Sequence, residues 1–367
     1  MNEQEIYYLL ALQKVKNIGD ISAKKLLRHF GSAKAVFDVV VKDKVDIQGI
    51  SEIMLNSIRD FSDWDRVDME MKFIADKQLN VMSIFDDDYP HKLFHAPDGP
   101  ILFFWKGNID WSLHRAISIV GTRKITHYGK RMTAEIIEGL KDYKPVIISG
   151  LAYGVDVEAH LNALKHRLPT IGVLGHGFDR IYPSIHKKIA DKMLENGGLI
   201  SEFWHSDIID RNNFLKRNRI VAGLSEATLI IESGVKGGSL VTADIANSYN
   251  RDVFAVPGRA NDTYSQGCNN LIKQNKAALV SSAQDIVDIL QWEETKVHKK
   301  NVQLNLFVEL SDEEQQIFDL LQEKGKMSLD EMAVSLQFPV SKTAQLLLKM
   351  ELNNIVKGLS GKIFELF

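Results

Sequence analysis

Short apolar runs alternate with amphipathic helical patterns through the middle of the chain. The runs are rich in β-branched residues and occupy 116–121, 145–150, 169–175, 197–202, 227–232 and 251–256. Nearly continuous apolarity is typical of strands buried on both faces, and the helical patterns between the runs predict βαβ crossovers. We therefore expect an α/β fold, with a parallel sheet covered by helices on both faces and its core within 111–292.

The N-terminal residues predict a small helical domain over 1–62. Residues 12–31 read as two short helices around a turn at 17–19, and a weaker copy of this pattern lies at 45–50. Such a pair resembles a tandem helix-hairpin-helix, whose turn amides often hold a DNA phosphate. Because residues 1–60 carry 9 basic and 8 acidic groups, we favour a helical adaptor over a DNA clamp.

An acidic stretch precedes the predicted sheet and is assigned to the same domain, 63–292. Residues 61–110 carry 5 basic and 10 acidic groups and contain two strand candidates, 79–85 and 101–105. The charged segment 293–310 lacks periodicity and predicts a linker.

The C-terminal segment 311–367 predicts three helices followed by a β-hairpin, which resembles a winged helix. Ser311 and Glu314 have the spacing of a capping box at the start of the first helix. Winged helices often read duplex DNA, but this segment carries 6 basic and 9 acidic groups, and its third helix has only Lys342 and Lys349 as bases. We therefore favour a protein-contact module.

Charge and composition restrict the function classes. The chain has 367 residues, a net charge of −3 and 45% hydrophobic residues, which exclude a disordered or collagen-like protein. Residues 111–292 carry 22 basic and 18 acidic groups. Because polyanion binding follows local positive density, this segment is where we expect a nucleic-acid site.

The chain's cysteine content and first residues indicate its compartment. The lone Cys268 forms no internal disulfide and suits a reducing cytoplasm. The first residues carry acids where a signal peptide needs bases, and their apolar run is too short to cross a bilayer. We expect a cytoplasmic protein with no membrane partner.

Glycine-rich loops follow several of the predicted strands, at the sheet edge where ligands bind in open parallel sheets. Glycine lets backbone amides approach an anion closely, and helix N-termini add a positive dipole end. These loops predict a phosphate-bearing ligand, although tight β-to-α turns also need glycine. The loops are 121–124, 149–154, 175–177 and 233–239, and they contain Gly121, Thr122, Arg123, Lys124, Gly150, Gly175, Gly177, Gly238 and Ser239.

Most catalytic motifs are absent from the sequence. It contains no P-loop, dinucleotide fingerprint, GxSxG elbow or HExxH motif. Asp156 and His160 lie four residues apart on one predicted helix and would form an acid–base pair, but we favour a capping Asp and a packed His. We predict no enzyme activity, no cofactor and no metal site.

The densest basic signal is residues 211–219, with four bases and no acid. On a helix, Phe214, Arg217 and Asn218 share a face, which Lys216 and Arg219 flank, and Arg211 precedes it. Cations, an aromatic plane and an amide are the mixture that single-stranded nucleic acid needs. Taken alone, a solvated basic helix that pairs with Glu202 or Glu226, with a buried Phe214, is an equal interpretation.

Ordered motifs from about residue 80 to 290 resemble the DNA-processing protein DprA (Smf) family. They include SIVGTR (118–123), IISGLAYGVDVEAH (147–160), FLKRNRIVAGLS (214–225), GGSLVTADIA (237–246) and VFAVPG (253–258). The resemblance implies an extended Rossmann-like domain, often with an N-terminal helical domain and a C-terminal winged helix. It also implies a homodimer that binds single-stranded DNA, protects incoming strands and loads the RecA recombinase during natural transformation.

The family's strand-binding residues fall on two segments of this chain. Its Gly-Ser/Thr-Arg turn corresponds to Gly121, Thr122 and Arg123, and its F-x-x-R-N-R helix to Phe214, Arg217, Asn218 and Arg219. The resemblance implies that these residues hold phosphates while the aromatic ring stacks on a base. Lys216 stands where many members have Pro or Arg.

Two other functions remain open at this point. Related Rossmann-like proteins hydrolyse nucleotide N-glycosidic bonds with an Arg and a Glu next to a Gly-Gly-x-Gly-Thr loop, which Gly237–Ser239 resembles faintly. The expected Glu is absent, and Asp244 is the nearest downstream acid. The other alternative is a duplex-DNA repair adaptor acting through residues 1–60.

Overall fold

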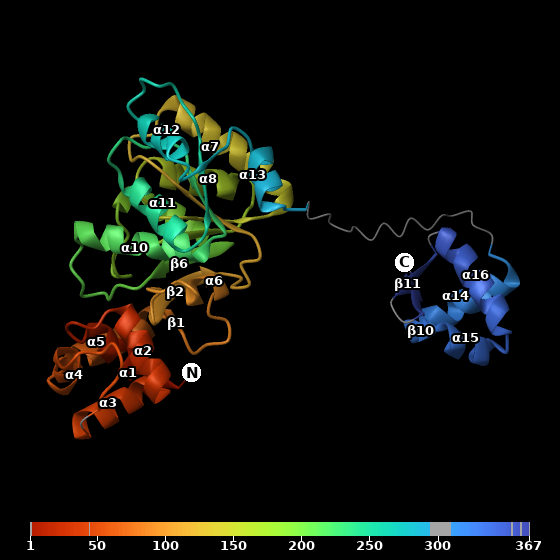
Figure 1. Cartoon of the computed structure of the whole chain (residues 1–367), viewed down its shortest axis with the longest axis horizontal. Helices are drawn as coiled ribbons and strands as arrows, with labels where there is room; N and C mark the ends of the chain where they lie inside the picture. Colours follow the sequence, from red (N-terminus) through yellow and green to blue (C-terminus); the bar gives the residue numbers. More distant parts are fainter. Residues whose placement is uncertain (1, 44, 294–309, 354, 360–361, 367) are drawn as a thin grey trace. The chain divides into compact units, whose positions relative to one another are not determined.

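The computed structural model describes residues 2–43, 45–293, 310–353, 355–359 and 362–366. Contacts divide the chain into two compact units, residues 1–295 and 296–367 (Figure 1). The predicted linker 293–310 lies outside the described residues, except for its two end residues.

Within the described residues, the first unit has one nine-stranded sheet with the order β1-β2-β6-β5-β4-β3-β7-β8-β9. β1 pairs antiparallel with β2, and β2 with β6, whereas the other neighbours are parallel. The strands are β1 (Asn80–Ser83), β2 (Leu102–Asn108), β3 (Ala116–Val120), β4 (Val146–Ser149), β5 (Thr170–Val173), β6 (Gly197–Ser201), β7 (Ala227–Ile230), β8 (Asp252–Ala255) and β9 (Ala278–Leu279). The predicted α/β class is confirmed.

The six apolar runs form β3 to β8, and burial explains why they are apolar throughout. Every residue of β3, β5, β6 and β7 is buried, because helices cover both faces of the sheet. The two strand candidates of the acidic stretch form β1 and β2, which extend the sheet at one edge. The two-residue strand β9 was not predicted.

Helices form a layer on each face of the sheet. Ile136 of α7, Ala159 of α8 and Ile286 of α13 share a core on one face, where α9 packs beside α8. On the other face, α6, α10, α11 and α12 contribute to a second core. These helices are α6 (His91–Phe94), α7 (His127–Gly139), α8 (Val155–Lys165), α9 (Lys187–Met193), α10 (Arg211–Leu224), α11 (Gly238–Ser248), α12 (Gln266–Lys273) and α13 (Ala283–Leu290), with 3₁₀ turns η1 (Lys141–Tyr143) and η2 (Ser184–His186).

The strand order reverses between β3 and β7. The chain moves outward from β3 through β4 and β5 to β6, and α10 then carries it back across the sheet to β7 on the other side of β3. In open parallel sheets, ligands bind beyond the carboxyl ends of the strands at such a switch point. The fold therefore places the loops after β3 and β7, with α10, around one position.

The N-terminal helices form one bundle that packs on the edge of the sheet (Figure 1). They are α1 (Glu3–Lys14), α2 (Asp20–Phe30), α3 (Ala33–Lys42), α4 (Glu52–Arg59) and α5 (Trp64–Lys77). The ring of Trp64 stacks on Tyr7 at 5.6 Å and contacts Phe37 at 5.3 Å. The helical unit thus continues to Lys77, beyond the boundary expected at residue 62, and its core includes Phe104 of β2 and Trp204.

The second unit has three helices and a small sheet. Its elements are α14 (Asp312–Lys324), β10 (Lys326–Ser328), α15 (Leu329–Leu336), α16 (Val340–Leu352), β11 (Val356–Leu359) and β12 (Ile363–Leu366). The predicted capping box of Ser311 and Glu314 is present. Strand β10, which pairs with β12, was not predicted. Both bases of α16 pair with acids of α14, at 2.5 Å for Lys342–Glu313 and 2.9 Å for Lys349–Glu314.

Candidate nucleic-acid interface

A cavity of about 420 Å³ lies at the switch point of the sheet. Its residues come from the loops after β3, β7 and β8, from the loop before α8, from the first residues of α8 and α11, and from one face of α10. They are Val120, Gly121, Thr122, Arg123, Ala152, Asp156, Arg211, Phe214, Leu215, Arg217, Asn218, Ser233, Gly234, Lys236, Gly237, Gly238, Ser239, Thr242 and Tyr264. Most of the predicted site residues therefore lie around one cavity.

Close packing fixes the loop after β3. A Cβ on Gly121 would lie 2.5 Å from Val155 Cγ2, so no side chain fits there. The Thr122 amide donates to the Glu232 carbonyl at 2.7 Å. The turn exposes Arg123 at the cavity and also exposes Lys124, which is not among the lining residues.

Glu232 is a buried acid that supports this loop and was not predicted. Its carboxylate accepts from the Thr126 amide at 2.9 Å and from the Thr126 hydroxyl at 2.5 Å, where α7 begins. A Cβ on Gly129 would lie 2.4 Å from Glu232 Oε2. Glu232 lies just after β7 in the sequence, and no neighbouring residue indicates its role. Its role depends on contacts with Thr126, about a hundred residues earlier.

Arg217 is a buried cation at the cavity, with only 4% of its surface exposed. Its Nη1 donates to the Val173 carbonyl, and a Cβ on Gly150 would lie 2.1 Å from the same nitrogen. Gly150 therefore makes room for the guanidinium, although it is not itself a lining residue. Within the described residues, Arg217 Nε has no hydrogen-bond partner. A buried cation with a spare donor favours an anionic ligand.

Asp156 is the one acid among the lining residues. Burial raises the pKa of its carboxyl, whereas the charge of Arg217 and backbone hydrogen bonds act in the opposite direction. The four basic lining residues, Arg123, Arg211, Arg217 and Lys236, therefore face a single acid. The cavity is cationic, as an anion site requires.

Phe214 and Asn218 follow Arg211 on the same face of α10. The Phe214 ring packs against Gly175, where a Cβ would lie 2.7 Å from ring atom Cδ1. The Arg123 guanidinium lies 5.8 Å from the Phe214 ring centroid, within cation–π range. Asn218 Nδ2 donates to the Gly238 carbonyl at 3.2 Å and so joins α10 to the loop after β7.

The N-terminus of α11 also lies at the cavity. Its N-cap, Gly237, makes no side-chain capping hydrogen bond. Gly238 and Ser239 line the cavity in the first turn, and Ser239 Oγ donates to Ser233 Oγ at 2.9 Å. Free amides and the dipole of an 11-residue helix add positive potential at this side of the cavity.

Arg219 and Lys216 do not lie at this cavity, and this corrects the predicted site. Arg219 is 5% exposed, and its Nη2 pairs with Glu202 and, at 3.0 Å, with Asp20 of α2. Lys216 Nζ lies 3.1 Å from Glu202 Oε2. Residues 217 and 219 are two apart on a helix, so their side chains point to nearly opposite faces. Arg219 is therefore a buried ion-pair residue.

The Asp156–His160 pair lacks the features of an acid–base site. His160 is fully buried, its Nδ1 lies 2.7 Å from Thr170 Oγ1, and it does not line the cavity. Burial, with smaller contributions from Arg217 and His186, lowers the pKa of His160 to about 3. This agrees with a packed, neutral histidine.

The acid considered for glycoside hydrolysis also lies outside the cavity lining. Asp244 is not a lining residue, and its carboxylate pairs with Lys276 at 2.9 Å. Over the described ranges, no group of three or more His, Cys, Asp and Glu side chains is arranged to hold a metal ion. In the same ranges, no helix has the length and apolarity needed to cross a membrane.

Two family models match the chain. The model described as DNA recombination-mediator protein A covers residues 80–291, and the model of the DprA winged helix domain covers 308–362. The second match confirms the predicted winged helix.

Similar proteins carry names that agree with these models. The DNA processing protein DprA of Streptococcus pneumoniae is 36% identical over 246 residues, which are 64% of this chain and 86% of the relative. The DNA processing protein DprA of Bacillus subtilis is 34% identical over 256 residues, 70% of this chain and 84% of the relative.

Two solved structures are similar in fold. DNA processing protein A from Streptococcus pneumoniae has a TM-score of 0.66 and 31% identity, covering 80% of this chain and 99% of that structure. DNA processing protein A from Helicobacter pylori has a TM-score of 0.52 and 29% identity, covering 58% and 96%. The Helicobacter pylori structure is described as showing a single-stranded DNA binding mode.

Proposed function

The chain belongs to the DNA recombination-mediator protein A family, and on this premise we propose that it binds single-stranded DNA in the switch-point cavity. The observation that carries the proposal is the convergence of four cations and the α11 N-terminus around one cavity with a single, buried acid. Phosphate oxygens satisfy such donors.

In the proposed complex, Arg123, Arg211, Arg217 and Lys236 neutralise successive phosphates, and Phe214 offers an aromatic surface to a base. The protein makes and breaks no covalent bond. Stacking contributes about 1–3 kcal/mol per base and tolerates every base, so phosphate contacts dominate affinity and sequence preference is slight.

Membership of the family supports a proposal for the wider role of the protein. We propose that the protein acts in the cytoplasm as a homodimer, protects incoming single strands and loads RecA onto them during natural transformation. Two cavities on one strand raise the effective concentration of the second contact, which favours long strands over short ones.

Fluorescence anisotropy with labelled oligo-dT, beside the matching duplex, tests the proposal. The full chain is expected to prefer the single strand, and Arg123→Ala to weaken strand binding about tenfold, the effect of one charged hydrogen bond. Arg131→Ala is the control, because Arg131 is an exposed residue of α7 whose Nε lies 3.8 Å from Glu135. Equal strand affinity for wild type and Arg123→Ala rejects the cavity as the site. AMP hydrolysis by the wild type instead supports the glycoside-hydrolase alternative.

A further inference from the structure

The loop between β6 and α10 is held by the N-terminal helices. Trp204 Nε1 donates to Gln13 Oε1 of α1 at 2.9 Å. The His205 ring stacks on Phe73 of α5 with centroids 4.4 Å apart, and the His205 amide donates to Glu70 Oε2 of α5 at 3.2 Å. Consecutive residues of this loop are thus attached to helices that precede them by more than a hundred positions.

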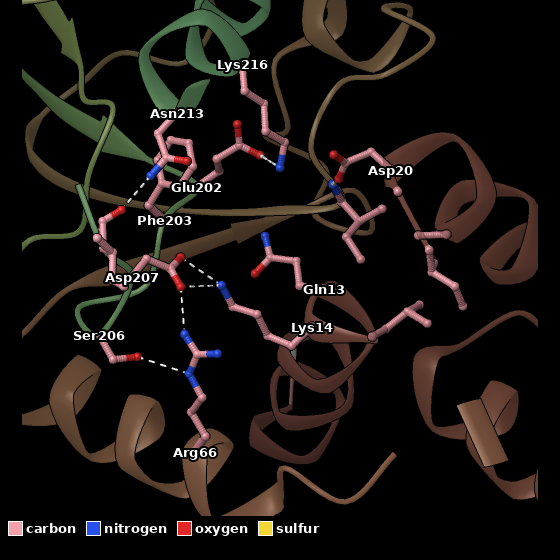
Figure 2. A pocket seen from close by; sticks show the side chains of 16 residues that line it. Gln13, Lys14, Asp20, Arg66, Glu202, Phe203, Ser206, Asp207, Asn213 and Lys216 are labelled. Atoms are coloured by element: carbon pink, nitrogen blue, oxygen red, sulfur yellow. Dashed lines mark hydrogen bonds and ion pairs between the residues drawn. The ribbon is translucent and has the colours of Figure 1, made fainter. Parts of the chain in front are cut away.

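Asp207, in the same loop, pairs with basic residues of two N-terminal helices (Figure 2). Its carboxylate accepts from Lys14 Nζ and from Arg66 Nη2, each at 2.7 Å, and from the Trp204 amide at 2.9 Å. Arg66 Nε also donates to Ser206 Oγ at 3.2 Å. One carboxylate therefore joins α1 and α5 to the loop that enters α10.

A second attachment joins α2 to α10 itself, through the Asp20–Arg219 pair at 3.0 Å. The two attachments lie before and after the part of α10 that lines the switch-point cavity with Arg211, Phe214 and Arg217. The N-terminal helices therefore hold this part of α10 from both ends.

The hollow between these elements has a volume of about 640 Å³ and a balanced charge. Lys14, Arg66 and Lys216 line it, and each pairs with a carboxylate, Asp207 or Glu202 (Figure 2). Cations that are already neutralised make a poor phosphate site, so these contacts suit attachment better than ligand binding.

We infer that the N-terminal helices position α10 for strand binding and that Asp207 is the positioning residue through which they act. The inference rests on the proposed function, because it assigns α10 a strand to bind. Asp207 does not line the switch-point cavity, so it acts through the helix. Binding groups need support that fixes them to within about 0.5 Å, and a released entry loop removes that support from Arg211 and Phe214.

Hydrogen exchange and strand affinity of Asp207→Asn, measured on the full chain, test the inference. The amide side chain can still accept from Trp204 but loses the charge that holds Lys14 and Arg66. We expect faster exchange over residues 211–218 and oligo-dT affinity reduced about fivefold to tenfold, the size of an ordinary coupling between sites. Asp191→Asn is the control, because it removes only the exposed Lys187–Asp191 pair of α9; it is expected to change neither measurement.

Two variants of Lys14 test the same inference if Asp207→Asn fails to fold. Lys14→Met removes one partner and leaves Asp207 in place, whereas Lys14→Arg keeps the charge. If amide hydrogen exchange in α10 is faster in Lys14→Met but has the wild-type rate in Lys14→Arg, the result supports the positioning role. Wild-type exchange and affinity in both Asp207→Asn and Lys14→Met overturn the inference. If the wild-type chain retains no oligo-dT, the proposed function fails, and the exchange measurement alone decides whether α10 is positioned from the N-terminal helices.

Discussion

Arg217 and Arg219 lie two residues apart on α10, are buried to nearly the same extent, and have different surroundings. Arg219 pairs with two carboxylates, Asp20 and Glu202. Arg217 has one buried acid nearby, Asp156, and a donor without a partner in the described part of the chain. A basic residue is available to a phosphate only where the fold leaves its charge uncompensated, whatever the basic density of the sequence around it.

The same criterion separates the cavity from the winged helix. Lys342 and Lys349, the bases of α16, pair with the first-turn acids of α14. A helix that enters a DNA groove needs free cations, so the ion pairs favour the interpretation of this domain as a protein-contact module.

The largest expected effect is on stability, in Arg219→Met. Removing the guanidinium leaves Asp20 buried without its ion-pair partner and leaves Glu202 paired with Lys216 alone. We expect this to lower the free energy of unfolding by about 3–5 kcal/mol. Urea denaturation followed by tryptophan fluorescence measures the change, with Arg131→Met as an exposed control. If Arg219→Met instead has wild-type stability but no longer binds single-stranded DNA, Arg219 has the phosphate-binding role that we give to Arg217.

The reverse pattern is expected for Arg217→Met. Strand affinity is expected to fall about tenfold to a hundredfold, which corresponds to about 1.5–3 kcal/mol for hydrogen bonds to a charged group. Stability falls less than in Arg219→Met, because the raised pKa of Asp156 lets that carboxyl take a proton once the guanidinium is gone. Unchanged affinity together with a large loss of stability would make both arginines structural.

His160, which lies near Arg217, predicts a dependence of stability on pH. Its pKa is about 3 in the folded chain, against about 6.5 when unfolded. Above pH 6.5 the His160 side chain is neutral in both the folded and the unfolded chain. Below that pH, only the unfolded chain binds a proton at His160. The free energy of unfolding therefore falls by about 1.4 kcal/mol per pH unit as the pH falls from about 6.5 toward 3.

His160→Gln removes this dependence, so its denaturation midpoints should decline less between pH 6.5 and 5 than those of the wild type. His114→Gln, at an exposed position, is the matched control and should follow the wild type. Parallel profiles for wild type and His160→Gln would show that His160 is not held neutral by burial.

The smallest effect is expected from Lys349→Met in the winged helix. The lysine of this pair is largely exposed, whereas Glu314 is buried and keeps its hydrogen bonds from the Ser311 amide and hydroxyl. We therefore expect the loss of Lys349 to cost about 1 kcal/mol. Affinity for both oligo-dT and duplex DNA should stay within about twofold of the wild type, as two gel-shift titrations would show. A clear loss of duplex affinity would identify this domain as a DNA reader.

The sequence predicts the sheet and the cavity because their signals are local. The apolar runs that become β3 to β8 reflect burial on both faces, and a strand end followed by glycine places residues such as Gly121 at the carboxyl edge. Helical periodicity also puts Phe214, Arg217 and Asn218 on one face. These features depend on residues that are neighbours in the chain or that recur with the periodicity of a helix.

What the sequence does not reveal depends on distant partners. Asp20 lies 199 residues before Arg219, and no local pattern indicates that it neutralises that arginine. Glu232 was missed for the same reason, because its role depends on the distant loop that it supports. Lys236 lies in the predicted ligand loop 233–239 but was not selected as a site residue. The helical unit extends to Lys77 because Trp64 packs on α1, a contact that periodicity within α5 cannot show.

The central claim is that uncompensated cations in the switch-point cavity bind the phosphates of a single strand. The most direct measurement is the salt dependence of oligo-dT affinity for the wild type and Arg123→Ala. With about four phosphates neutralised, the logarithm of affinity should fall with the logarithm of salt at a slope of roughly −2.8, and Arg123→Ala should reduce the slope by about 0.7. A wild-type affinity that does not change with salt, or an identical slope for Arg123→Ala, would contradict the claim.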